Sequence, residues 1–140
     1  MFKNILVAVD GSEHSYKAAK LAGDLARNLG SELWVVIAYD PVPGYLGEPY
    51  LQRAISERMD HAEKLFEEAK QEIGSITGEL HTEILEDDPA EAILTVAETR
   101  NVDLIVMGTR GLGKLKGMLQ GSQSQKVVGH AVCPVLLVVK

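Results

Sequence analysis

Five short apolar runs, separated by longer stretches with the spacing of amphipathic helices, constrain the fold of this chain more than any other feature. The runs span Lys3–Val9, Leu33–Ala38, Leu80–Leu85, Leu104–Met107 and Val135–Val139. Strands that are almost wholly apolar are typical of parallel sheets, where both faces are buried. The alternation of strands with helices predicts right-handed crossovers and helices on both faces of the sheet. We therefore predict an α/β fold with a five-stranded parallel sheet, in which residues 1–140 form a single domain.

The first helix is predicted between the first two runs. Ser12 or Ser15 can cap its N-terminus, and Gly30 suits the left-handed position that follows a helix. Its apolar face, with spacings of three and four residues, consists of Ala18, Ala22, Leu25 and Leu29.

Two further helices have equally clear ends. Tyr39–Pro49 holds three prolines and two glycines and is predicted to be a loop, which a long helix follows at Tyr50–Ile73. The apolar stripe of this long helix consists of Ile55, Met59, Ala62, Phe66, Ala69 and Ile73. Asp88 caps the next helix, Pro89 occupies its first turn, and the helix ends near Arg100.

The pattern leaves two strand orders open, 3-2-1-4-5 and 2-1-3-4-5. In the first order the chain reverses between the first and fourth strands, and ligands bind beyond the carboxyl ends of those two strands. One end is the turn Asp10-Gly11-Ser12, and the other is Gly108-Thr109-Arg110-Gly111. In that order the two glycine-rich strand exits would meet at one crevice.

A glycine-rich segment between Gly108 and Gly121 precedes the last predicted helix, Ser122–Ala131. Loops of this length inside a compact domain are usually functional. A helix N-terminus presents free N–H groups and the positive end of the helix dipole, which suits a phosphate. The hydroxyls of Ser122 and Ser124 would add donors there.

Two common nucleotide motifs fail in this chain. Gly108-x4-Gly113-Lys114 matches the start of a P-loop, but Leu115 stands where a hydroxyl should bind Mg²⁺. The dinucleotide motif G-x-G-x-x-G is absent after the first strand, where Asp10 begins a different turn.

A third pattern fits. Gly108-x2-Gly111-x9-Gly121-Ser122 resembles the signature of the ATP-binding class of the universal stress protein family. The chain also resembles this family at its opening strand and acidic turn, at its fourth strand and at its closing strand, in the segments Ile5–Ser12, Leu104–Gly108 and Cys133–Val139. The resemblance covers essentially the whole chain.

The resemblance implies a Rossmann-like sheet of order 3-2-1-4-5, of the adenine nucleotide alpha hydrolase-like type, that binds ATP with or without Mg²⁺. It implies that Asp10 contacts the ribose or adenine side, that the backbone at Ala38 reads the adenine edge, and that Met107 packs near the sugar. The ribose and phosphates would be held by Gly108, Gly111, Gly121 and Ser122.

Two residues depart from the family pattern. Arg110 stands where histidine is common, and Gln123 stands where a small apolar residue is common. Arg110 could add a phosphate contact. Ser12, Gly113 and Ser124 complete the set of candidate nucleotide-binding residues.

Charge and composition set the expected partners. The net charge of −6 argues against general nucleic-acid binding. Residues 1–103 carry a net charge of −11 and the remaining residues carry +5, so the basic C-terminal part is either a chance run of basic residues or an anion site.

The N-terminus lacks the features of a signal peptide, and no apolar stretch is long enough to span a membrane, so a cytoplasmic location is expected. Cys133 is the single cysteine and is expected to be a buried, inert thiol, and the four histidines show no metal-ligand spacing, so no metal site is predicted.

Three hypotheses for function follow. The leading one is an ATP-binding sensor in stress signalling, with at most slow hydrolysis, that forms a homodimer through the apolar edge strand Val135–Val139. The alternative is a nucleotide-free interaction module of the same fold that acts through its dimer surface. The third, an ATP-using enzyme such as an adenylyl transferase, needs a base or an acidic metal site that the sequence does not offer.

Overall fold

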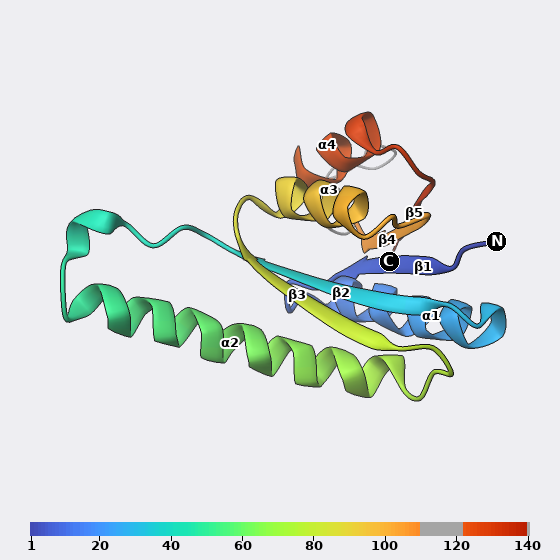
Figure 1. Ribbon diagram of the computed structural model, residues 1–140, viewed down its shortest axis with the longest axis horizontal. Helices are drawn as coiled ribbons and strands as arrows, with labels where there is room; N and C mark the ends of the chain where they lie inside the picture. Colours follow the sequence, from blue (N-terminus) through green and yellow to red (C-terminus); the bar gives the residue numbers. More distant parts are fainter. Residues whose placement is uncertain (110–121, 140) are drawn as a thin grey trace.

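A single parallel sheet organises the molecule. The computed structural model describes residues 1–109 and 122–139. The strands are β1 Asn4–Ala8, β2 Glu32–Tyr39, β3 Leu80–Glu86, β4 Leu104–Gly108 and β5 Val135–Val138. Their spatial order is β3-β2-β1-β4-β5, and every neighbouring pair is parallel (Figure 1). The α/β class and the order implied by the family resemblance are both confirmed.

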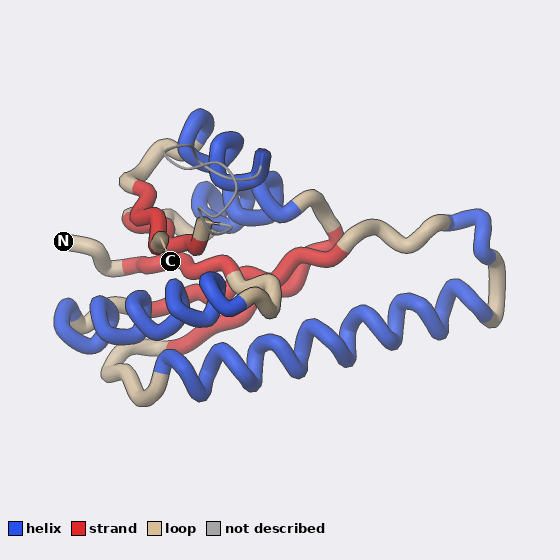
Figure 2. Tube along the Cα trace, turned by 180° about the vertical axis from the view of Figure 1, so that it is seen from behind, coloured by secondary structure: helices blue, strands red, loops and turns tan. Residues whose placement is uncertain are grey.

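The helices form one layer on each side of the sheet. They are α1 Glu13–Leu29, α2 Tyr50–Ile73, α3 Pro89–Thr99 and α4 Ser122–His130, with a short 3₁₀ turn, η1, at Gly44–Leu46. α1 and α2 cover one face, and α3 and α4 cover the other (Figures 1 and 2). Within the described residues, no helix combines the length and apolar character that crossing a membrane requires.

Side-chain alternation along β1 divides the core between the two layers. Ile5 and Val7 pack toward α1 and α2, and Leu6 packs toward α3. All three side chains are completely buried. The central strand therefore contributes to both apolar layers, as its almost continuous apolar sequence predicts.

The helix ends follow the predicted capping residues. Ser12, rather than Ser15, is the N-cap of α1, and its side chain accepts a hydrogen bond from the Ser15 amide at 3.2 Å. Gly30 adopts a left-handed conformation, with φ of 68°, directly after α1. Asp88 caps α3 and Pro89 opens it.

Three details differ from the expectations. Leu29 lies on the predicted face of α1 but is 46% exposed, because it is the last residue of the helix and lies beyond Gly23 and Arg27, the positions that contact the end of α2 at Ile73. In α2 the buried residue at the middle of the stripe is Leu65, while Phe66 is only partly buried. Cys133 is half-buried rather than buried, and this burial, together with the charge of Asp103, raises the pKa of its thiol.

Candidate functional site

A pocket opens at the carboxyl ends of the strands, where the strand order reverses between β1 and β4. Its walls come from the ends of β1, β2 and β4 and from the first turns of α1, α3 and α4. This is the position at which open parallel sheets bind ligands. The lining residues are Ala8, Val9, Asp10, Ser12, His14, Ser15, Val36, Ala38, Pro89, Ile93, Met107, Gly108, Gln123 and Ser124.

The structure brings seven of the predicted site residues to this pocket. They are Asp10, Ser12, Ala38, Met107, Gly108, Gln123 and Ser124. Ser122 is the first residue of α4, next to Gln123. Four further candidates, Arg110, Gly111, Gly113 and Gly121, lie outside the described residues.

Sequence reasoning missed the wall that α3 supplies. Pro89 and Ile93 line the pocket from the first turns of this helix. The order of elements could have predicted this wall, because a helix that follows a parallel strand begins at the sheet edge where the crevice lies. Val36 could also have been predicted as a pocket residue, since it lies two residues before Ala38 and therefore on the same face of β2.

The turn after β1 is held by hydrogen bonds to Asp10. The Ser12 amide donates to Asp10 Oδ1 at 2.9 Å, and the Ser12 hydroxyl donates to the same oxygen. Gly11 has φ of 88°, a conformation that few other residues adopt. Partial burial raises the pKa of the Asp10 carboxyl, but the hydrogen bonds from Ser12 outweigh this effect and hold the pKa below its ordinary value. Asp10 is thus a fixed anionic acceptor in the lining of the pocket.

Gly108 permits close packing between β4 and α1. A Cβ atom at this position would lie 2.6 Å from the carbonyl oxygen of His14. The first turn of α1 therefore rests directly on the end of β4. The two strand exits predicted to meet do lie together, and the absence of a side chain at Gly108 is one reason.

A polar network joins α3 to α4 beside the pocket. The Ala90 amide donates to Gln123 Oε1 at 2.9 Å, and Gln123 Nε2 donates to Asp88 Oδ1 at 2.7 Å. Lys126 Nζ lies 3.4 Å from Asp88 and 2.7 Å from Glu91. The hydrogen bond from Gln123, with further contributions from the Glu91 amide and Lys126, lowers the pKa of Asp88. Gln123 thus lines the pocket while its amide connects the two helix N-termini.

The remaining walls combine an apolar side with helix N-termini. Val36, Ile93 and Met107 are at most 6% exposed and form an apolar surface together with Ala38. The N-terminal turns of α1, α3 and α4 converge on the same space. Each brings the positive end of a helix dipole, which attracts anions, while the Ser15 amide of α1 and the Ala90 and Glu91 amides of α3 are already bound within the protein.

These features define a class: a doubly wound α/β protein with a ligand pocket at the switch point of a parallel sheet. The model of the universal stress protein family matches residues 1–139. A universal stress protein of Thermus aquaticus is 51% identical over 140 residues, with 99% of each chain covered. The chain therefore belongs to the universal stress protein family.

Solved structures of this family share the fold. The universal stress protein UspA from Lactobacillus plantarum superposes with a TM-score of 0.81 at 27% identity, covering 98% of this chain and 97% of that one. A universal stress protein in complex with cAMP gives a TM-score of 0.74 at 22% identity, covering 98% and 97% of the two chains. The resemblance seen in the sequence is thus confirmed at the level of family and fold.

Proposed function

We propose that this protein binds an adenine nucleotide, with ATP as the ligand and Mg²⁺ as an accompanying cation, and acts as a nucleotide-dependent regulator. The observation that carries the proposal is the convergence of three helix N-termini on a pocket that has an apolar wall and a fixed carboxylate. An apolar slot suits a nucleobase, a carboxylate suits ribose hydroxyls, and helix N-termini suit phosphates.

In this proposal the adenine packs against Val36, Ala38 and Met107, and the ribose donates hydrogen bonds to Asp10. The phosphates extend toward the N-terminus of α4, where Ser122 and Ser124 lie. The candidates Arg110, Gly111, Gly113 and Gly121 complete the phosphate site in this proposal. The related protein that was solved in complex with cAMP shares the fold, and its ligand contains an adenine.

Titration calorimetry with ATP, with and without Mg²⁺, tests the proposal. Ala38→Phe should abolish binding, because a phenyl ring would fill the apolar slot. Asp10→Ala should weaken binding by about tenfold or more, as expected for the loss of a hydrogen bond to a charged group. Asp60→Ala, which removes an exposed carboxylate on α2, is the matched control and should bind normally. Absence of binding at millimolar nucleotide would refute the assignment.

We propose that any hydrolysis is slow, below about one turnover per second, which is at the low end for enzymes. Asp10, the carboxylate of the pocket lining, is already engaged by Ser12 and is held ionised. A group bound in this way serves as a hydrogen-bond acceptor rather than as a tuned general base. Steady-state phosphate release by the purified protein measures this directly, and faster turnover would restore the enzyme hypothesis.

We propose further that two copies pair along β5. This strand lies at the edge of the sheet, and Leu136 and Val139 on and beside it are 37% and 53% exposed. The unpaired backbone N–H and C=O groups of an edge strand gain hydrogen-bond partners when the strand pairs with a second copy. Light scattering should show a dimer that Leu136→Lys dissociates. Leu46→Lys, at a similarly exposed leucine on η1, should leave the dimer intact, and a monomeric parent protein would contradict the proposal.

A further inference from the structure

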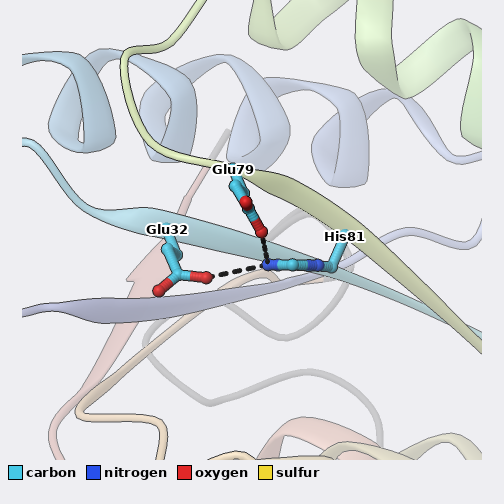
Figure 3. Close-up of side chains that lie close together, drawn as sticks. All are labelled: Glu32, Glu79 and His81. Atoms are coloured by element: carbon cyan, nitrogen blue, oxygen red, sulfur yellow. Dashed lines mark hydrogen bonds and ion pairs between the residues drawn. The ribbon is translucent and has the colours of Figure 1, made fainter.

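We propose that Glu32, Glu79 and His81 form a binding site for a divalent transition-metal cation, with Zn²⁺ as the best fit. His81 Nε2 lies 2.8 Å from Glu32 Oε1 and 3.4 Å from Glu79 Oε2. The three donor atoms all lie within 4.8 Å of one another. Figure 3 shows both carboxylates pointing toward the same imidazole nitrogen.

The register between β2 and β3 explains this convergence. Leu33 pairs with Leu80 and Trp34 pairs with His81, so Glu32 and Glu79 lie at adjacent positions just before these pairs. Residues two apart on a strand share a face. Glu79 and His81 are thus on the same face of the sheet as Glu32 and Trp34. Glu32 lies about 50 positions before Glu79 and His81 in the sequence, which is why the three residues give no metal-binding pattern there.

The two carboxylates of the cluster favour the binding of a divalent cation. Like charges at adjacent positions on neighbouring strands destabilise a sheet. His81 Nε2 carries at most one proton, so it can donate to only one of the two carboxylates at a time. A divalent cation would contact both carboxylates and the imidazole together. Arg100 Nε, from the end of α3, instead donates to Glu83 Oε1 at 2.9 Å.

Two of the three donor separations suit a tetrahedral ion, and the third, between the two carboxylates, is within 4.8 Å. Ligands at about 2.0–2.1 Å from Zn²⁺ lie roughly 3.3 Å from each other in tetrahedral geometry. The His81–Glu79 separation of 3.4 Å already has this value, and the His81–Glu32 separation of 2.8 Å needs to widen by only a fraction of an ångström. One imidazole and two carboxylates leave the fourth position for water. Imidazole nitrogen selects Zn²⁺ and its neighbours over Mg²⁺, which prefers oxygen ligands alone.

Stacking holds the imidazole in place. The rings of Trp34 and His81 stack with centroids 3.9 Å apart and planes 17° from parallel. The guanidinium of Arg100 lies over the same Trp34 ring, 4.8 Å from its centroid. A ligand whose ring orientation is fixed in this way loses little freedom on binding a metal.

The cluster lies at the opposite end of the sheet from the nucleotide pocket. Glu32 begins β2, whereas Ala38 is at the pocket end of that strand, about 20 Å away at 3.3 Å per residue. The metal site therefore does not depend on the proposed nucleotide site.

Trp34 provides a direct measurement, because it is the only tryptophan of the chain. Zn²⁺ titrated into the nucleotide-free, full-length protein should change Trp34 emission and saturate at one equivalent. Mg²⁺ should have no effect. Glu79→Gln should weaken Zn²⁺ binding at least about tenfold, while leaving the stack between Trp34 and His81 in place. Glu79 is 78% exposed at its side chain, so this variant should fold normally.

Calorimetry with His81→Ala should show the same loss of binding. His61→Ala and Glu63→Gln, on the exposed surface of α2, are the matched controls and should keep the affinity of the parent protein. Equal Zn²⁺ affinity in the parent protein, Glu79→Gln and His81→Ala would overturn the proposal. So would the absence of one-equivalent binding up to about 100 times the protein concentration used.

Discussion

Single residues shape the candidate site through close approaches and fixed hydrogen bonds. Gly108 lets the first turn of α1 rest on the end of β4, and Ser12 holds both the helix cap and the Asp10 carboxylate. These two positions serve the fold before they serve any ligand. Loss of function at either one must therefore be separated from loss of stability.

We expect Gly108→Ala to destabilise the protein by about 1–3 kcal/mol, as overpacking in a rigid environment does. The new methyl group would meet the backbone of His14, which cannot rotate away as a side chain would. Gly129→Ala is the control, because nothing lies within 4 Å of its Cβ position and it stands inside α4. That change should be neutral or stabilising by up to about 1 kcal/mol. Urea denaturation measures both, and equal effects would contradict this reasoning.

The lowered pKa of Asp88 predicts a pH dependence of stability. A carboxyl whose pKa is depressed on folding stabilises the native state above its unfolded pKa of about 3.9, and this contribution is lost as pH falls through the folded value. The side chain is 39% exposed, so the contribution is only about 0.5–1 kcal/mol. The stability gap between the parent protein and Asp88→Asn should be constant from pH 7 to 5 and close below pH 4. A gap that widens in acid would show that the carboxylate is not the stabilising form.

At this scale the sequence predicted the chemistry of the turns better than the neighbours of each side chain. The cap at Asp88 followed from its position before Pro89, and Gly30 followed from its position after an apolar stripe. The hydrogen bond from Gln123 to Asp88 could not be predicted, because periodicity carries no information about which helix N-termini meet. The closeness of Glu32 and His81 could not be predicted either, because it depends on which strands pair and in which register.

Among the elements, α2 is the one that extends furthest from the sheet. Its buried residues, Ala62, Leu65, Ala69 and Ile73, all lie in its C-terminal half. Figure 1 shows the N-terminal half and η1 reaching beyond the strands. The predicted bounds of α2 are correct, yet Ile55 and Met59 of its predicted stripe are only partly buried. An apolar stripe shows which face could pack, but not how far the sheet extends beneath it.

We therefore expect a gradient of hydrogen exchange along α2. Amides of residues 54–58 should exchange at least about tenfold faster than those of residues 65–73, since local opening there breaks few apolar contacts. The first turn also lacks a side-chain cap at Pro49. Exchange measured by NMR or mass spectrometry tests this, with α1 as the internal comparison because Ser12 caps it and its buried residues begin at Ser15. Uniform protection along α2 would contradict the expectation.

The whole molecule has two apolar core layers, one on each face of its single sheet. Ile73 belongs to the layer under α1 and α2, and Ile93 to the layer under α3 and α4. The apolar pattern predicted both layers, but it left the strand order open, since crossovers of these lengths fit either order. Only the family resemblance selected the observed order, and with it the place of the pocket.

Because β1 belongs to both layers, we expect the two to unfold together. Ile73→Ala and Ile93→Ala should each lower the free energy of unfolding by about 2–5 kcal/mol. In both variants, circular dichroism and Trp34 emission should report the same urea midpoint. Separate midpoints for the two probes would show that the layers unfold independently.

The central position of β1 has a consequence for how the molecule is assembled. Its two neighbours, β2 and β4, come from opposite parts of the chain, and Ile5 pairs with Leu104 across almost a hundred residues. Such distant pairings close late, because a long loop must first lose its freedom. While the polypeptide is still being synthesised, α1 and α2 can already cover their face of the sheet. The pocket is still incomplete at that stage, because β4 and the helices on the other face have not yet been added. A small molecule held there can stabilise the finished protein only, and its effect falls entirely on the last stage of folding.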